Sequence, residues 1–139
     1  MQRTIATTHD KLQALEREHA VVTQDANGAV MITLDPFVEA GSKLYDELLA
    51  GFSHALGPER HAAFVTLGTE QVDRALGRFG VVQRTLTVTR DPASDHRHYM
   101  VWDEQAWAGN RGATTGNYRS REELMSRVGA IMNLLPADF

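Results

Sequence analysis

The chain has 139 residues, of which 42% are hydrophobic and 23% are charged, a balance typical of a globular domain and not of a disordered segment. It contains no cysteine, which excludes disulfides, thiolate metal sites and a cysteine nucleophile. The formal net charge of −4 disfavours a general nucleic-acid or anionic-membrane binder. Because this length suits one hydrophobic core, we expect a single α+β domain over residues 1–139.

The first eight residues lack the apolar run of a signal peptide, and no stretch is long enough to span a membrane. We therefore expect no membrane insertion by this chain. Its location depends on whether the chain is complete. A complete chain predicts a cytoplasmic protein, and a soluble fragment taken from behind a membrane anchor predicts an extracytoplasmic one.

The N-terminal part predicts a helix followed by a β-hairpin. Apolar residues three and four apart predict a short amphipathic helix over residues 10–19, with Thr8 or Asp10 as its N-cap. A hairpin is expected over residues 20–34. Its two β-rich runs flank Asn27-Gly28, and this pair favours a tight turn because both residues tolerate positive φ.

A long helix is the clearest element of the sequence. Asp35 is expected as its N-cap, one apolar face continues to Leu56, and Gly57-Pro58 ends it. A break at Gly41-Ser42 is the alternative, because glycine inside a helix costs about 1 kcal/mol relative to alanine. Two shorter helices are expected next, over residues 59–67 and, capped by Thr69, over residues 69–79.

The second half predicts a longer hairpin and a last helix. Residues 81–90 and 96–104 alternate as strands around a polar turn, whereas the glycine- and asparagine-rich segment 109–117 predicts a loop. A capping box at Ser120 opens a helix that Pro136 ends. The expected order is αββαααββα.

These elements predict a two-layer α+β fold. The two hairpins would join into a four-stranded antiparallel sheet, and the long helix and the last helix would cover its apolar face. The core is expected to include Leu48, Phe52, Leu86, Trp102 and Ile131.

A weak metal-site pattern lies at the start of the last predicted strand. His96 and His98 would project from the same face, with Asp95 beside them, and two imidazoles plus a carboxylate suit Zn²⁺ or another divalent metal. A solvated, polar end of a hairpin has the same composition and is the favoured interpretation. We therefore expect no cofactor, and a metal-dependent or small-molecule enzyme using these histidines is the alternative function.

The most informative surface is the second predicted hairpin, where arginines alternate with aromatic residues. Such a surface binds proteins through aromatic and arginine anchors, or single-stranded nucleic acid by stacking and phosphate contacts. The acidic total charge disfavours nucleic acid, and an ordinary solvated sheet is the third possibility. The candidate binding residues are Arg84, Arg90, Arg97, Tyr99, Trp102 and Arg111.

Motifs for nucleotide hydrolysis and for zinc proteases are absent from the sequence, and the nearest approach to a serine nucleophile elbow is incomplete. We therefore expect a non-catalytic protein-interaction or ligand-binding domain. Residues 99–102 are apolar on both faces of their strand, and a two-layer fold covers only one. Self-association, a protein partner or the 109–117 segment is expected to cover the other.

Overall fold

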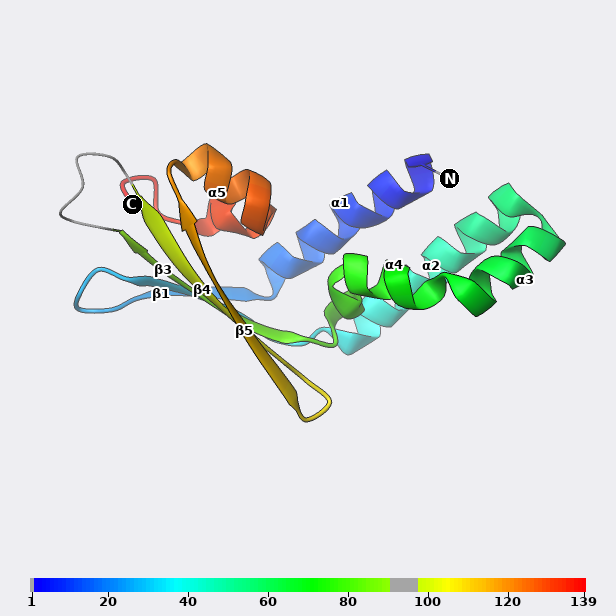
Figure 1. Ribbon diagram of the computed structural model, residues 1–139, viewed down its shortest axis with the longest axis horizontal. Coiled ribbons are helices and arrows are strands. Elements are labelled where there is room, and N and C mark those ends of the chain that lie inside the picture. The colour runs from blue at the N-terminus through cyan, green and yellow to red at the C-terminus, as the bar shows by residue number, and fades with distance from the viewer. Residues whose placement is uncertain (1, 91–97) are drawn as a thin grey trace. The chain divides into compact units, whose positions relative to one another are not determined.

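The computed structural model describes residues 2–90 and 98–139, which form two compact units (Figure 1). The helical unit lies within Met1–Glu16 and Pro36–Val82, and the sheet unit lies within Arg17–Asp35 and Gln83–Phe139. Each unit has its own buried residues. That residues 1–139 behave as one domain stays a prediction.

The helical unit is built from four α-helices and a 3₁₀ turn. Its elements are α1 (Gln2–Glu18, of which the last two residues belong to the sheet unit), α2 (Val38–Leu56), α3 (Pro58–Leu67), α4 (Thr69–Ala75) and η1 (Gly77–Gly80).

The first helix begins earlier than residue 10, and Thr8, expected as an N-cap, is a buried residue inside it. The early turns of α1 approach α2 through small side chains. A Cβ on Gly51 would lie 2.6 Å from Cγ2 of Thr4, and Lys11 pairs with Glu47 one turn earlier in α2. Small and polar contacts of this kind leave no mark in an apolar periodicity, which explains the short prediction.

The long helix α2 is unbroken at Gly41, so the alternative break is wrong. Gly41 is buried, and a Cβ there would overlap the carbonyl oxygen of Phe79 in η1. The glycine therefore permits the backbone of η1 to approach the helix. Asp35 is not the N-cap: Phe37 takes that position, and its N–H donates to the carbonyl of Gly80 at 2.9 Å.

The end of α2 at Gly57-Pro58 is confirmed, with Gly57 at a φ of 75°. Thr69 does not cap α4, because its hydroxyl donates instead to the carbonyl of Val65 at 3.1 Å, and Gly68 is the N-cap. The predicted helix over residues 69–79 ends at Ala75 and continues as η1, which contains three residues at positive φ, Arg78, Phe79 and Gly80.

The described residues of the sheet unit form five antiparallel strands in the order β1-β2-β3-β4-β5, not the four expected. The first hairpin and the alternation of the third strand are confirmed. The strands are β1 (Ala20–Gln24), β2 (Val30–Leu34), β3 (Gln83–Arg90), β4 (Tyr99–Trp107) and β5 (Asn110–Tyr118).

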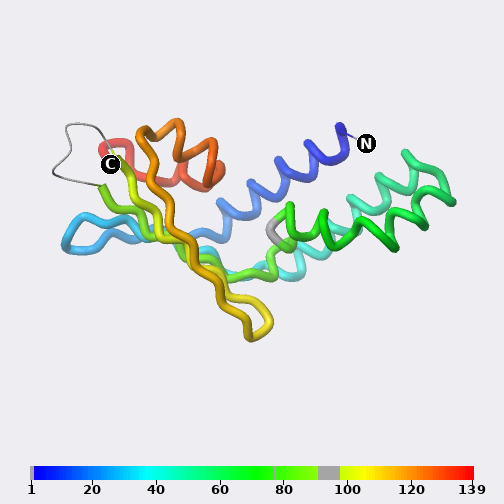
Figure 2. Tube along the Cα trace, viewed as in Figure 1, coloured from blue at the N-terminus to red at the C-terminus, as the bar shows by residue number. Residues whose placement is uncertain are grey.

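The fifth strand is the segment predicted as a loop, and Figure 2 shows it running back beside β4. Ala108 and Gly109 connect the two strands with φ values of 44° and 77°, the pattern of a type I′ turn. The side chain of Trp107 lies 3.7 Å from a Cβ placed on Gly112, and a Cβ on Gly116 would overlap the phenol of Tyr118. Aromatic rings thus fill the spaces above glycines that have little β-propensity of their own, so pairing with β4 overrides local preference.

A short helix and a 3₁₀ turn replace the single last helix of the prediction. Ser120 caps α5 (Arg121–Val128) as expected, accepting the N–H of Glu123 at 3.1 Å. Gly129, at a φ of 121°, separates α5 from η2 (Ala130–Leu134). The left-handed backbone of the glycine interrupts an apolar pattern that the sequence carries through it.

The sheet unit has two layers. One face of the sheet is covered by α5, η2 and the C-terminal residues. The guanidinium of Arg121 holds this segment by donating to the carbonyls of Leu135 and Pro136 at 2.7 and 2.8 Å. We call this the covered face. Its buried residues, with those of the covering segment, are Val30, Ile32, Leu34, Leu86, Val88, Tyr99, Val101, Leu124, Ile131, Met132, Leu135 and Phe139.

The long helix was expected to cover the sheet, but α2 belongs to the helical unit. There its apolar face is used against other helices. Phe52 of α2 packs edge-on against Phe64 of α3, with ring centroids 4.8 Å apart, and Tyr45 packs against Phe79 with centroids 5.0 Å apart.

Candidate binding surface on the sheet

Strand β4 presents its side chains alternately to the two faces of the sheet. Tyr99 and Val101 lie on the covered face and are 1% and 2% exposed, whereas Met100 and Trp102 on the opposite face are 49% and 45% exposed. The expected alternation along this strand is therefore confirmed. The expectation that Trp102 belongs to the core is wrong, because it shares a face with Met100. We call this second side of the sheet the open face.

Pairing of the strands places Trp102 on the open face between β3 and β5. Thr87 of β3 lies opposite it on one side and Thr115 of β5 on the other, and Met31 of β2 lies beyond Thr87. Met31 is 40% exposed, so this row across the sheet contains a second exposed apolar side chain besides Trp102. The described residues of the open face are Val21, Thr23, Met31, Thr33, Gln83, Thr85, Thr87, Thr89, Met100, Trp102, Glu104, Ala106, Arg111, Ala113, Thr115 and Asn117.

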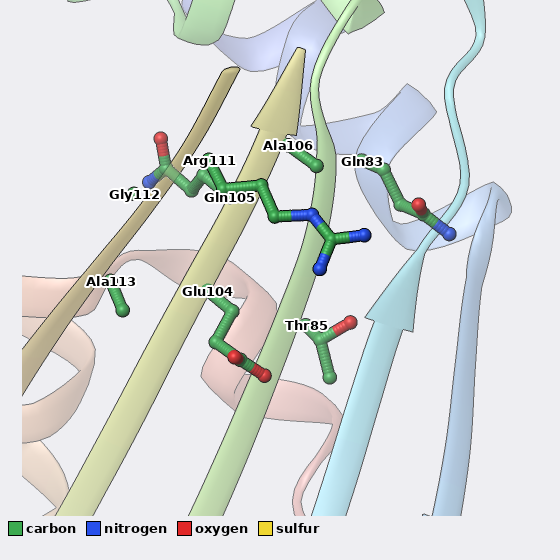
Figure 3. A pocket seen from close by; sticks show the side chains of 8 residues that line it. All are labelled: Gln83, Thr85, Glu104, Gln105, Ala106, Arg111, Gly112 and Ala113. Carbon is green, nitrogen blue, oxygen red and sulfur yellow. The ribbon is translucent and has the colours of Figure 1, made fainter. Parts of the chain in front are cut away.

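Two hollows of the sheet unit lie toward opposite ends of β4. The first, of about 400 Å³, is lined by residues that include Thr85, Glu104 and Arg111 (Figure 3). In that view the guanidinium of Arg111 extends across β4 toward β3, and the carboxylate of Glu104 points toward Thr85. The second, of about 640 Å³, includes Thr89, His98 and Met100. Trp102 lies between the two in the strand sequence.

Arg84, one of the predicted binding residues, lies on the covered face and is engaged there. Its Nε donates to Oδ1 of Asp103 at 3.0 Å and its Nη2 to Oδ2 at 2.7 Å, a bidentate pair. The two side chains are 19% and 14% exposed. Sequence reasoning missed this pair, although a signal existed. Arg84 lies two residues before Leu86 in β3, and Asp103 lies two residues after Val101 in β4. Because alternate residues of a strand share a face, the sequence pattern puts both charged side chains on the apolar face.

The other predicted residues divide between the two faces. Tyr99 is in the core, where its hydroxyl donates to the carbonyl of Phe139 at 3.3 Å, and Arg90 lies opposite Tyr99 in the register and is exposed. Arg97 lies outside the described residues. The open face therefore brings together Trp102 and Arg111 of the original set.

The candidate metal ligands are only partly described. His98 is exposed and directly precedes β4, whereas His96 and Asp95 lie outside the described residues. Within residues 2–90 and 98–139, histidines, aspartates and glutamates form no group of three or more that is suited to hold a metal ion. The metal hypothesis stays a prediction.

In the described part of the chain, no helix combines the length and the apolar character needed to cross a membrane. Comparison with protein-family models, curated proteins and solved structures finds no match.

Proposed function

We propose that this chain is a non-catalytic protein-interaction module whose contact surface is the open face centred on Trp102. The observation that carries the proposal is the exposure of Trp102, 45%, beside Met100, 49%, on a face built from consecutive strands. Tryptophan is enriched among the residues that dominate protein–protein contacts, and methionine is enriched at interfaces because its flexible thioether adapts to its partner.

The surroundings of Trp102 suit a protein contact. Thr87 and Thr115 lie on either side of the indole across the strands, and their β-branched side chains have little rotamer freedom to lose on binding. Glu104 and Arg111 add one charge of each sign further along the face. An apolar centre with a polar margin is the usual anatomy of an interface.

The same residues disfavour single-stranded nucleic acid as the partner. Glu104 follows Trp102 by two residues on the same strand, so its carboxylate lies on the same face. A base stacked on Trp102 would bring its phosphates close to that negative charge, and the whole chain carries a net charge of −4. A protein surface that offers apolar side chains meets no such repulsion.

The proposal is tested by site-specific photo-crosslinking in the native cells. A photoreactive amino acid replaces Trp102 in one variant and Met31 in a second, both on the open face. A third carries it at Leu67, which is 80% exposed in the helical unit and serves as the matched control. We expect a discrete protein adduct from positions 102 and 31 and none from 67. The absence of adducts from both open-face positions, or equal adducts from all three, would refute the proposal.

A further inference from the structure

The outer edge of β5 carries an inference that does not depend on the open face. In the described sheet β5 is the terminal strand, and its side chains are exposed except at Gly116 and Tyr118. Its nine residues contain one charge, no lysine and no proline. Exposed edges are usually blunted by lysine, proline or a short strand, because free backbone groups invite another strand.

The turn at Ala108-Gly109 fixes which backbone groups of β5 face outward. A two-residue hairpin turn closes on a hydrogen-bonded pair, here Trp107 and Asn110, so alternate residues of β5 from Asn110 onward bond to β4. The N–H and C=O groups of the intervening residues point away from the sheet. These are Arg111, Ala113, Thr115 and Asn117.

The sequence of β5 is symmetric about Thr114 in its glycines, and small residues lie on both sides of that position. Gly112 and Gly116 are equally distant from it, and Ala113 and Thr115 are its neighbours on either side. If a second copy of β5 lies antiparallel with Thr114 opposite Thr114, the outward-facing residues meet one another and form hydrogen-bonded pairs. The strand is thus complementary to itself in one particular register.

We propose that a second copy of this chain pairs with β5 edge to edge, in the register that sets Thr114 opposite its counterpart. Small residues then meet small residues near the two-fold axis, and threonine faces threonine, a favourable cross-strand pair. Arg111 lies opposite Asn117, so the only charge of the strand does not meet its own copy. An isologous contact of this kind closes as a dimer.

The symmetry of β5 favours a second copy over a foreign extended peptide. A foreign strand needs only free backbone groups and gains nothing from a sequence centred on Thr114. The opposite edge of the sheet, β1, does not share this character: it has only five residues, and no residue type recurs at equal distances on the two sides of its central Val22.

Thr114 provides the test because it is the one position that meets itself. Thr114→Lys and Thr114→Glu each set like charges directly opposite each other, which destabilises a strand pair. Light scattering coupled to size exclusion, over a wide range of concentration, is expected to give twice the mass of one chain for the parent. Each variant alone should give the mass of one chain. An equimolar mixture of the two variants should recover the doubled mass, because lysine then faces glutamate.

Thr23→Lys, on the exposed edge strand β1, is the matched control and should leave the dimer intact. Trp102→Glu should also leave it intact, which separates this inference from the proposed function. Far-UV circular dichroism checks that every variant is folded. If either charged variant fails to fold, Thr115→Pro replaces it, since proline there removes an outward N–H and no bond to β4. A parent of single-chain mass at every concentration, or a dimer that survives both charges or the proline, would overturn the inference.

Discussion

The two faces of β4 use hydrophobic residues for different purposes. Tyr99 and Val101 are almost completely buried, whereas Met100 and Trp102, their neighbours in sequence, are about half exposed. The side chain that determines stability and the side chain available for binding therefore alternate along one strand. Hydrophobicity alone does not separate them, since the most hydrophobic run of the strand supplies both. A substitution one residue before or after the intended position falls on the other face. It then tests stability where binding was intended, or binding where stability was intended.

The largest expected effect is at Tyr99. Tyr99→Glu places a carboxylate where the native ring is 1% exposed and packs near Phe139, so we expect a loss of about 4 kcal/mol or more of unfolding free energy. Tyr99→Phe, which removes only the hydrogen bond to Phe139, should cost about 1 kcal/mol. Urea denaturation followed by circular dichroism measures both. A Tyr99→Glu protein as stable as the parent would show that this face is not covered in solution.

The ion pair on the covered face provides the next test. Asp103→Ala leaves the guanidinium of Arg84 largely buried without its bidentate partner, which should cost about 3 kcal/mol. Replacing both residues, as Arg84→Met with Asp103→Leu, should recover most of that loss because no unpaired charge remains. Urea denaturation of the single and double variants measures the free energy of unfolding of each. A single variant with parental stability would mean that water reaches Arg84 freely.

Two glycines of β5, Gly112 and Gly116, allow the packing of aromatic rings against the strand to be compared at two positions. Gly116→Ala introduces a Cβ that overlaps the phenol of Tyr118, so the ring must move, and we expect a cost of about 1–3 kcal/mol. Gly112→Ala is the matched control, because its Cβ would lie at an ordinary 3.7 Å from the ring of Trp107. That change should be close to neutral. Equal melting temperatures for the two variants would contradict the packing described for Tyr118.

The smallest effect is expected on the open face. Trp102→Thr exchanges a half-exposed indole for a residue with good β-propensity, so stability should change by about 1 kcal/mol or less. The same variant should abolish the partner contact proposed for this face. Thermal unfolding measures the first quantity, and the crosslinking yield from position 31 measures the second. A large loss of stability would return Trp102 to the core and remove the basis of the proposed function.

The sequence predicts the elements whose signals are local. The hairpin around Asn27-Gly28, the end of α2 at Gly57 and the cap at Ser120 depend on backbone chemistry that a few residues determine, and each is confirmed. The hairpin differs from the expected tight turn in that residues 25–29 connect its strands and only Gly28, at a φ of 83°, has positive φ there. The alternation of β3 and β4 is also local and assigns every side chain to a face. Which side chains share a face was therefore predictable, including the placement of Arg84 on the side of Leu86 and Val88.

The elements that depend on distant partners were not predictable in the same way. The segment that becomes β5 is rich in glycine and asparagine, and it forms a strand because β4 supplies the pairing and Trp107 supplies the packing. Gly41 resembles a helix breaker until the carbonyl of Phe79 is known to lie against it. That α5, η2 and the C-terminal residues cover the sheet, and the long helix α2 does not, required knowledge that α2 packs in the other unit.

The pair formed by Arg84 and Asp103 also favours the observed alignment of the strands over an alignment shifted by one residue. A shift of one residue between strand and core would turn every side chain to the other face. On β3 that shift buries Thr85 and Thr87 in place of Leu86 and Val88, which hydrophobic burial penalises, whereas over residues 99–102 of β4 it exchanges one large apolar residue for another, which burial penalises only weakly. For Arg84 and Asp103 it would separate a bidentate contact and move both charges into water. The pair thus adds a geometric preference to hydrophobic burial for the alignment that keeps Trp102 on the open face.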